Sequence, residues 1–174
     1  MNTNEIILFG DAMGTKHHLK NLLFNQLAVN MHEIHNSFSR TFMDYYLHSR
    51  NLHCYTISDS VIAKWTNELE GIRYCLPFAI DFYKNIKHPY RVFIDSGKSI
   101  KNKTGYGKLA NHISERYQNL LPISFGLWSV SVAESAHFPT GIYVGQDICK
   151  KLSSKFKFDG VYEVQDFTYK MLKL

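Results

Sequence analysis

Two aspartates, Asp11 and Asp59, each follow a short apolar segment that is typical of a buried strand. Residues 5–10 precede Asp11 and residues 54–58 precede Asp59, and the chain between them has room for two helices. Paired carboxylates on adjacent strands suit two Mg²⁺ or Mn²⁺ ions, which bind hard oxygen ligands and substrate phosphates. Two such ions can activate an attacking oxygen and stabilise a leaving one in phosphoryl displacement. The pair therefore predicts an enzyme that acts on a nucleotide.

Asp11 is followed by Ala12, Met13, Gly14 and Thr15 at a predicted strand-to-helix junction. Backbone N–H groups at the start of a helix bind phosphate, and a glycine lets the backbone approach it closely. We expect Asp11 to ligate metal while residues 12–15 hold a triphosphate. The simpler alternative is that Asp11 ends a strand and Thr15 caps a helix.

These segments resemble a known family. Residues 9–15 (FGDAMGT) and 56–63 (TISDSVIA) look like the two metal-binding segments of class III nucleotidyl cyclases. The resemblance is closest to the small stand-alone bacterial branch that includes the pyrimidine cyclases of Pycsar anti-phage defence. Residues 91–97 (RVFIDSG) are similar to the fourth strand of that branch, and residues 125–139 to the following helix.

The resemblance implies a function and a set of site residues. Two Mg²⁺ or Mn²⁺ ions would be held by Asp11, Ala12 and Asp59, and the backbone from Ala12 to Thr15 would bind phosphates. The nucleotide 3′-hydroxyl would attack its own α-phosphorus and release pyrophosphate. The product would be cUMP or cCMP, a signal in anti-phage defence. The family works as a head-to-tail homodimer with its sites at the interface.

The chain departs from the purine cyclases on a late helix. Those enzymes carry an Asn and an Arg four residues apart, which serve the ribose and the transition state. Residues 126–134 (GLWSVSVAE) contain neither. Arg91 or Lys98 could supply positive charge instead, and Arg91 is the candidate catalytic residue. The missing pair favours an alternative, a non-catalytic cyclase-like domain that binds a nucleotide or a partner protein.

Tyr55 is the candidate for base recognition. Adenylyl cyclases commonly place a lysine four positions before the second metal aspartate, and here that position is Tyr55. An aromatic ring fills volume and can stack, which favours a smaller pyrimidine. Alternation along a strand would put Tyr55 and Asp59 on one face. Tyrosine also has a high strand propensity, so an ordinary structural role is the alternative.

Hydrophobic periodicity predicts the elements that position these residues. The first half has the order strand, helices, strand, strand, helix, strand, which is the βαββαβ arrangement of ferredoxin-like palm domains. We therefore expect an α+β fold with an antiparallel-rich sheet and helices on one face. The predicted elements are a strand at 5–10, a helix from Thr15 to 46 that breaks near 36–37, strands at 52–57 and 61–65, a helix at 68–86 and a strand at 91–95.

The second half is predicted less completely. Gly97, Gly105 and Gly107 indicate a loop before a helix at 106–120. The remaining elements expected are a helix at 126–136, a strand at 141–144, a short helix at 147–152 and a terminal strand at 161–164.

Bulk properties narrow the class of protein. The 174 residues are 45% hydrophobic and 20% charged, which fits a single domain over residues 1–174. The net charge is +5, but the lysines are scattered, whereas a nucleic-acid transferase needs a basic track.

No apolar run approaches the roughly 18 residues of a membrane span. His32 and His35 lack the spacing of a zincin motif. Three scattered cysteines and the absence of a secretory signal pattern predict a cytoplasmic protein.

Overall fold

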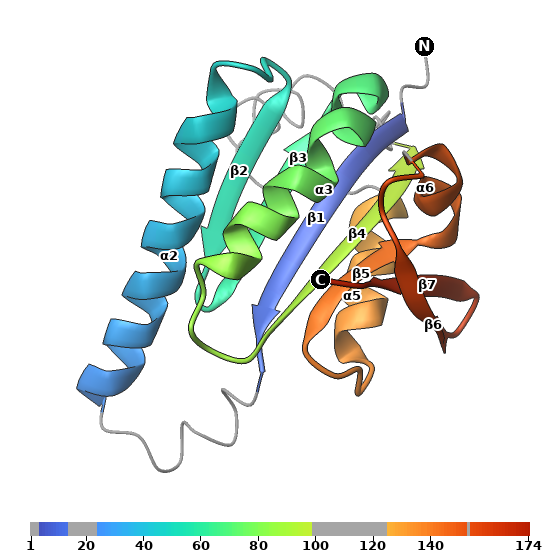
Figure 1. The fold of residues 1–174 in the computed structure, drawn as a ribbon. Coiled ribbons are helices and arrows are strands. Elements are labelled where there is room, and N and C mark those ends of the chain that lie inside the picture. Colours follow the sequence, from blue (N-terminus) through green and yellow to red (C-terminus); the bar gives the residue numbers. More distant parts are fainter. Residues whose placement is uncertain (1–3, 14–23, 99–124, 153) are drawn as a thin grey trace, which may run out of the picture.

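The computed structural model describes residues 4–13, 24–98, 125–152 and 154–174 (Figure 1). Several sequence predictions lie outside these residues: Gly14 and Thr15, the start of the first helix, the loop at 99–107 and the helix at 106–120.

The described residues build a seven-stranded sheet in the order β2-β3-β1-β4-β5-β7-β6. Neighbouring strands are antiparallel, except that β4 and β5 are parallel. The strands are β1 (Asn4–Ala12), β2 (Leu52–Ile57), β3 (Ser60–Trp65), β4 (Tyr90–Lys98), β5 (Gly141–Gly145), β6 (Phe158–Val164) and β7 (Phe167–Leu172).

The helices and the order of the elements match the predicted fold class. They are α2 (Phe24–Tyr46), α3 (Glu68–Lys84), α5 (Phe125–Ser135) and α6 (Gln146–Lys151). The element order β1-α2-β2-β3-α3-β4, with the sheet order β2-β3-β1-β4, is the βαββαβ arrangement that the sequence predicts. The α+β class and the antiparallel-rich sheet are therefore confirmed. No helix among the described residues has the length and apolar character needed to cross a bilayer.

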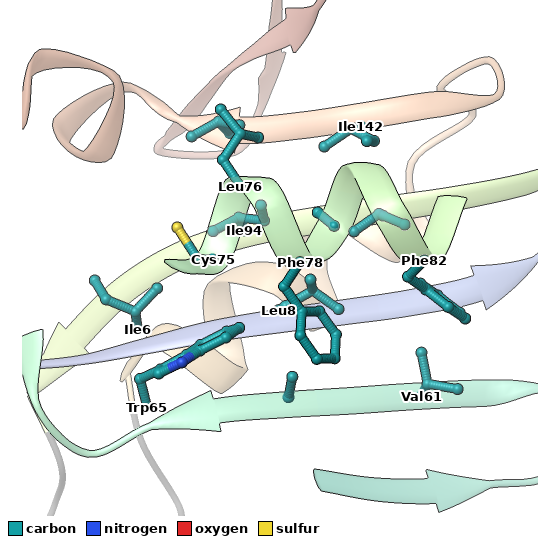
Figure 2. Close-up of a cluster of buried hydrophobic side chains, with 14 of the residues drawn as sticks. Ile6, Leu8, Val61, Trp65, Cys75, Leu76, Phe78, Phe82, Ile94 and Ile142 are labelled. Carbon is teal, nitrogen blue, oxygen red and sulfur yellow. The ribbon is translucent and has the colours of Figure 1, made fainter. Parts of the chain in front are cut away.

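The larger core lies between the sheet and the helices α2 and α3 (Figures 1 and 2). Side chains alternate along β1, so Ile6 and Leu8 face these helices. Trp65 packs edge-to-face on Phe78 of α3, with ring centroids 5.5 Å apart. This core fixes β1, β3 and β4 beside one another, and these three strands position the candidate site.

A second apolar cluster covers the opposite face of the sheet. Ile7 of β1 and Phe93 of β4 belong to it, together with Val130 and Ala133 of α5. Phe93 also stacks on Tyr143, with centroids 5.3 Å apart. The helix α5 is thus held against β1 and β4, on the face to which Asp11 and Arg91 also belong by alternation.

The structure corrects three sequence predictions. The predicted break near 36–37 is wrong, because α2 runs without interruption from Phe24 to Tyr46. Its polar residues find partners without ending the helix: the Ser37 hydroxyl donates to the Asn85 carbonyl and the Thr41 hydroxyl to the Ser37 carbonyl. Gly97 lies within β4 rather than in a loop, and β6 is followed by a further strand, β7.

Candidate active site

Asp11 lies near the end of β1, between β3 and β4. Its direct cross-strand partner on β4 is Arg91. On the other side, the hydroxyl of Ser60 at the start of β3 donates a hydrogen bond of 2.7 Å to Asp11 Oδ1. The Asp11 side chain is 16% exposed, so its carboxylate is largely enclosed but open to one side.

Asp59 lies in the two-residue turn that joins β2 to β3. Ser58 before it has a φ of 56°, in the left-handed region. The predicted alternation from Tyr55 to Asp59 is therefore wrong, because β2 ends at Ile57 and the turn changes the chain direction before Asp59. Tyr55 nevertheless packs with the cluster on the face of the sheet that carries Asp11.

The two aspartates are close enough to influence each other electrostatically. The pKa of Asp11 is raised to about 6, mainly by burial and also by the negative charges of Asp59 and Glu134, while the Ser60 hydrogen bond opposes this shift. Crowded, partly desolvated carboxylates of this kind are the donor set that a divalent cation requires. The residues present therefore fit Mg²⁺ or Mn²⁺.

The described residues supply only part of a coordination shell. Within the described residues, no three His, Cys, Asp or Glu side chains gather closely enough to hold a metal ion together. Asp11 and Asp59 would be the side-chain ligands, with backbone oxygens, waters and substrate phosphates completing the shell, as is usual for Mg²⁺.

Arg91 is a buried bridge between the sheet and α5. Its Nη2 lies 3.8 Å from Asp11 Oδ2 and 3.7 Å from Glu134 Oε1, and its Nη1 donates a 2.6 Å hydrogen bond to the Ala136 carbonyl. Its side chain is 10% exposed and lies over the ring of Phe93. The guanidinium is therefore enclosed by the carboxylates of Asp11 and Glu134 and the carbonyl of Ala136.

The first residues of the predicted phosphate loop, Ala12 and Met13, make backbone contacts with the rest of the fold. The backbone N–H of Met13 donates a 2.9 Å hydrogen bond to the Pro89 carbonyl, so it is not free to bind phosphate. Ala12 is still part of β1, opposite Tyr90. Gly14 and Thr15 lie outside the described residues, so their expected phosphate contacts stay predictions.

Several solved structures of cyclase domains have this architecture. The guanylyl cyclase domain of the RhoGC fusion protein of the aquatic fungus Blastocladiella emersonii, as a double mutant, superposes with a TM-score of 0.68 at 12% identity over 99% of this chain and 95% of that one. The guanylate cyclase domain of RhGC from Catenaria anguillulae, in complex with GTP, gives 0.66 at 10% identity over 99% and 97%. The adenylyl cyclase CyaB from P. aeruginosa gives 0.65 at 12% over 100% and 96%.

The chain has the fold of the class III nucleotidyl cyclase domains. No family description and no curated protein sequence matches it. The fold similarity extends over nearly the whole length of both chains in each comparison.

Several residues of this cyclase-fold site were not predicted. Ser60 and Glu134 contact Asp11 or its arginine, and His35 and Tyr90 contact the turn that carries Asp59. Ser60 is next to Asp59 in the sequence, which could have indicated it. The others come from α2, β4 and α5, and only the pairing of these elements brings them to the aspartates.

Proposed function

We propose that this protein is a nucleotide cyclase that converts a nucleoside triphosphate to a 3′,5′-cyclic nucleotide and pyrophosphate. The observation that carries the proposal is the meeting of Asp11 and Asp59 at one end of the sheet, at the end of β1 and in the β2–β3 turn, within a cyclase fold. The oxygen of the substrate 3′-hydroxyl bonds to its α-phosphorus, and the bond to the β-phosphate bridging oxygen breaks. Pyrophosphate leaves, and the hydroxyl proton passes to solvent.

The chain's own residues orient the carboxylates for this reaction. Asp11 and Asp59 would hold Mg²⁺ or Mn²⁺, which when bound supplies Lewis-acid stabilisation and a more acidic hydroxyl. Ser60 fixes one oxygen of Asp11 and Arg91 faces the other. The guanidinium also lies 3.7 Å from Glu134, whose negative charge disfavours the ionised form of Asp11.

Tyr55 supports a preference for UTP or CTP. It pairs with Ile62, which pairs in turn with Phe9, two residues before Asp11. This places Tyr55 about 12 Å from Asp11 along the same face, from ~4.8 Å per strand and ~3.3 Å per residue. That separation suits a base whose triphosphate is near Asp11, and a tyrosine there limits the size of the base. A signalling role in anti-phage defence and a homodimeric site are part of the proposal through the family resemblance.

The direct test incubates purified protein with Mn²⁺ and each of the four nucleoside triphosphates and identifies products by mass. We expect cUMP or cCMP from the wild type and no product from Asp11→Ala or Asp59→Ala. Asp166→Ala is the matched control, because Asp166 is exposed in the turn between β6 and β7. Activity within a few-fold of wild type in either site variant would contradict the cyclase mechanism.

A second candidate function is nucleotide binding without turnover. It is favoured by α5, whose residues Phe125–Ser135 include neither Asn nor Arg. Nucleotide binding that requires Asp11, with no cyclic product from any of the four substrates, would decide for this alternative.

A further inference from the structure

We propose that His35 and Tyr90 are positioning residues that fix the Ser58–Asp59 turn and thereby set where the Asp59 carboxylate stands relative to Asp11. This inference rests on the proposed function, because it assigns the two residues to the same metal-dependent site. Neither residue lies on a strand or turn that carries a site aspartate: His35 is on α2 and Tyr90 begins β4.

His35 holds the first carbonyl of the turn. Its Nε2 lies 2.6 Å from the Ser58 carbonyl oxygen. A carbonyl only accepts, so Nε2 carries the proton and donates. Ser58 has a φ of 56°, a conformation that is uncommon for a residue with a side chain and persists where neighbouring groups hold it. The histidine is one such group, and it ties the turn to α2.

Tyr90 holds the next carbonyl from a different element, the strand β4. Its hydroxyl donates a 3.1 Å hydrogen bond to the Asp59 carbonyl. Tyr90 is 1% exposed, and its ring packs edge-to-face on Phe82 with centroids 5.5 Å apart. Burial raises its pKa well above the ordinary value, so the hydroxyl stays a donor at every physiological pH.

Gly10 makes this contact possible. Tyr90 is on β4 and the Asp59 turn follows β2, so the tyrosine reaches the turn across β1. A β-carbon at Gly10 would lie 2.6 Å from Tyr90 Cε1 and 3.2 Å from its hydroxyl oxygen. The ring therefore passes over β1 at the one residue there without a side chain, directly before Asp11.

The consequence is that consecutive carbonyls of one turn are fixed by two different elements. Holding the Ser58 and Asp59 carbonyls orients the peptide groups on both sides of the Asp59 α-carbon, and so the direction of its carboxylate. Positioning of this kind matters, because a shift of about 1 Å at a reacting centre can cost roughly 10²-fold in rate.

The test uses variants that remove one hydrogen bond each. Tyr90→Phe deletes only the hydroxyl, His35→Ala removes the ring, and His35→Gln keeps an N–H donor. Tyr143→Phe is the control for Tyr90, since Tyr143 is equally buried and its hydroxyl donates to the Pro139 carbonyl at 2.8 Å. His32→Ala is the control for His35, because His32 is exposed on the same helix and contacts Asn36.

Two readouts are measured: Mn²⁺ binding by electron paramagnetic resonance with a non-reactive nucleotide analogue present, and kcat with the preferred nucleotide. We expect Tyr90→Phe and His35→Ala to weaken Mn²⁺ binding at least fivefold and to lower kcat about 10- to 100-fold, in line with the cost of misplacement. His35→Gln should recover most of both, and the controls should stay within about twofold of wild type.

Failure of this inference can be told from failure of the proposed function. If the wild type binds Mn²⁺ through Asp59 but forms no cyclic nucleotide, the cyclase proposal fails and Mn²⁺ binding still tests His35 and Tyr90. Mn²⁺ affinities of Tyr90→Phe and His35→Ala equal to those of the controls would overturn the inference. Mn²⁺ binding by the wild type that does not need Asp59 would overturn it as well.

Discussion

Arg91 and Asp11 are direct register partners on β4 and β1, and the guanidinium Nη2 lies 3.8 Å from Asp11 Oδ2. The same nitrogen lies 3.7 Å from Glu134 Oε1 of α5. One buried cation therefore stands between two carboxylates from different elements. The contact fastens α5 to the sheet beside the candidate metal aspartate, so stability and site geometry depend on the same side chain.

Replacing Arg91 should destabilise the fold strongly. Arg91→Met leaves two carboxylates without their cation, and removal of one partner from a buried ion pair costs about 3–5 kcal/mol. Urea unfolding of the purified variant measures this loss. Lys150→Met is the control, because Lys150 pairs with Asp147 at the exposed surface, where such pairs contribute ~0–1 kcal/mol. Equal losses for the two variants would contradict a bridging role for Arg91.

The titration of Asp11 should lower the stability of the metal-free protein as the pH rises from about 4 to about 6. Burial raises the pKa of Asp11 from 3.8 to about 6 in the folded state. In that window the folded protein holds a proton that the unfolded chain has lost, so the free energy of unfolding decreases, by about 3 kcal/mol in total. Asp11→Asn removes this titration.

The measurement is urea unfolding of wild type and Asp11→Asn in EDTA from pH 4 to pH 8. The free energy of unfolding of Asp11→Asn, relative to that of the wild type, should increase as the pH rises. Parallel curves of unfolding free energy against pH would refute the assignment of this pH dependence to Asp11. Adding Mn²⁺ at pH 7 should stabilise the wild type and leave Asp11→Asn unchanged, because an ion that binds only the folded state shifts the equilibrium toward it.

Tyr55→Ala should relax the choice of base. Removing the ring enlarges the space on the face shared with Asp11, so discrimination against ATP and GTP should weaken by about 1–3 kcal/mol, the range of pocket-fit selectivity. Relative kcat/KM for UTP, CTP, ATP and GTP in wild type and variant measures this discrimination. Unchanged ratios, or a wild type that already prefers ATP, would exclude the pyrimidine assignment.

We expect the active form to be a symmetric dimer of two 20.2 kDa chains. If the site is completed by a second subunit, activity per chain should fall on dilution together with the dimer fraction. Light scattering coupled to size exclusion, with assays on the same samples, measures both quantities. A 20.2 kDa species that keeps full activity would rule out a shared site.

Local patterns in the sequence were enough to predict the framework of this protein. Alternation and turn residues predict the hairpin formed by β2 and β3, and apolar spacing predicts the helix α3, which starts where expected. The order of these elements leads to the βαββαβ arrangement. Two aspartates beside short apolar strands indicate the candidate metal site. These features arise from residues that are close together in the sequence, so hydrophobic periodicity and turn residues indicate them directly.

Only the tertiary structure decided how the side chains meet. The left-handed Ser58 turns Asp59 away from the strand alternation that Tyr55 follows, and sequence periodicity does not encode a single positive φ. Arg91 faces Asp11 and Glu134 because β4 pairs with β1 while α5 returns over the second face. Tyr90 reaches the Asp59 turn only because β1 carries a glycine beneath its ring. These contacts join residues far apart in the chain, so their positions follow from strand register and packing rather than from local sequence.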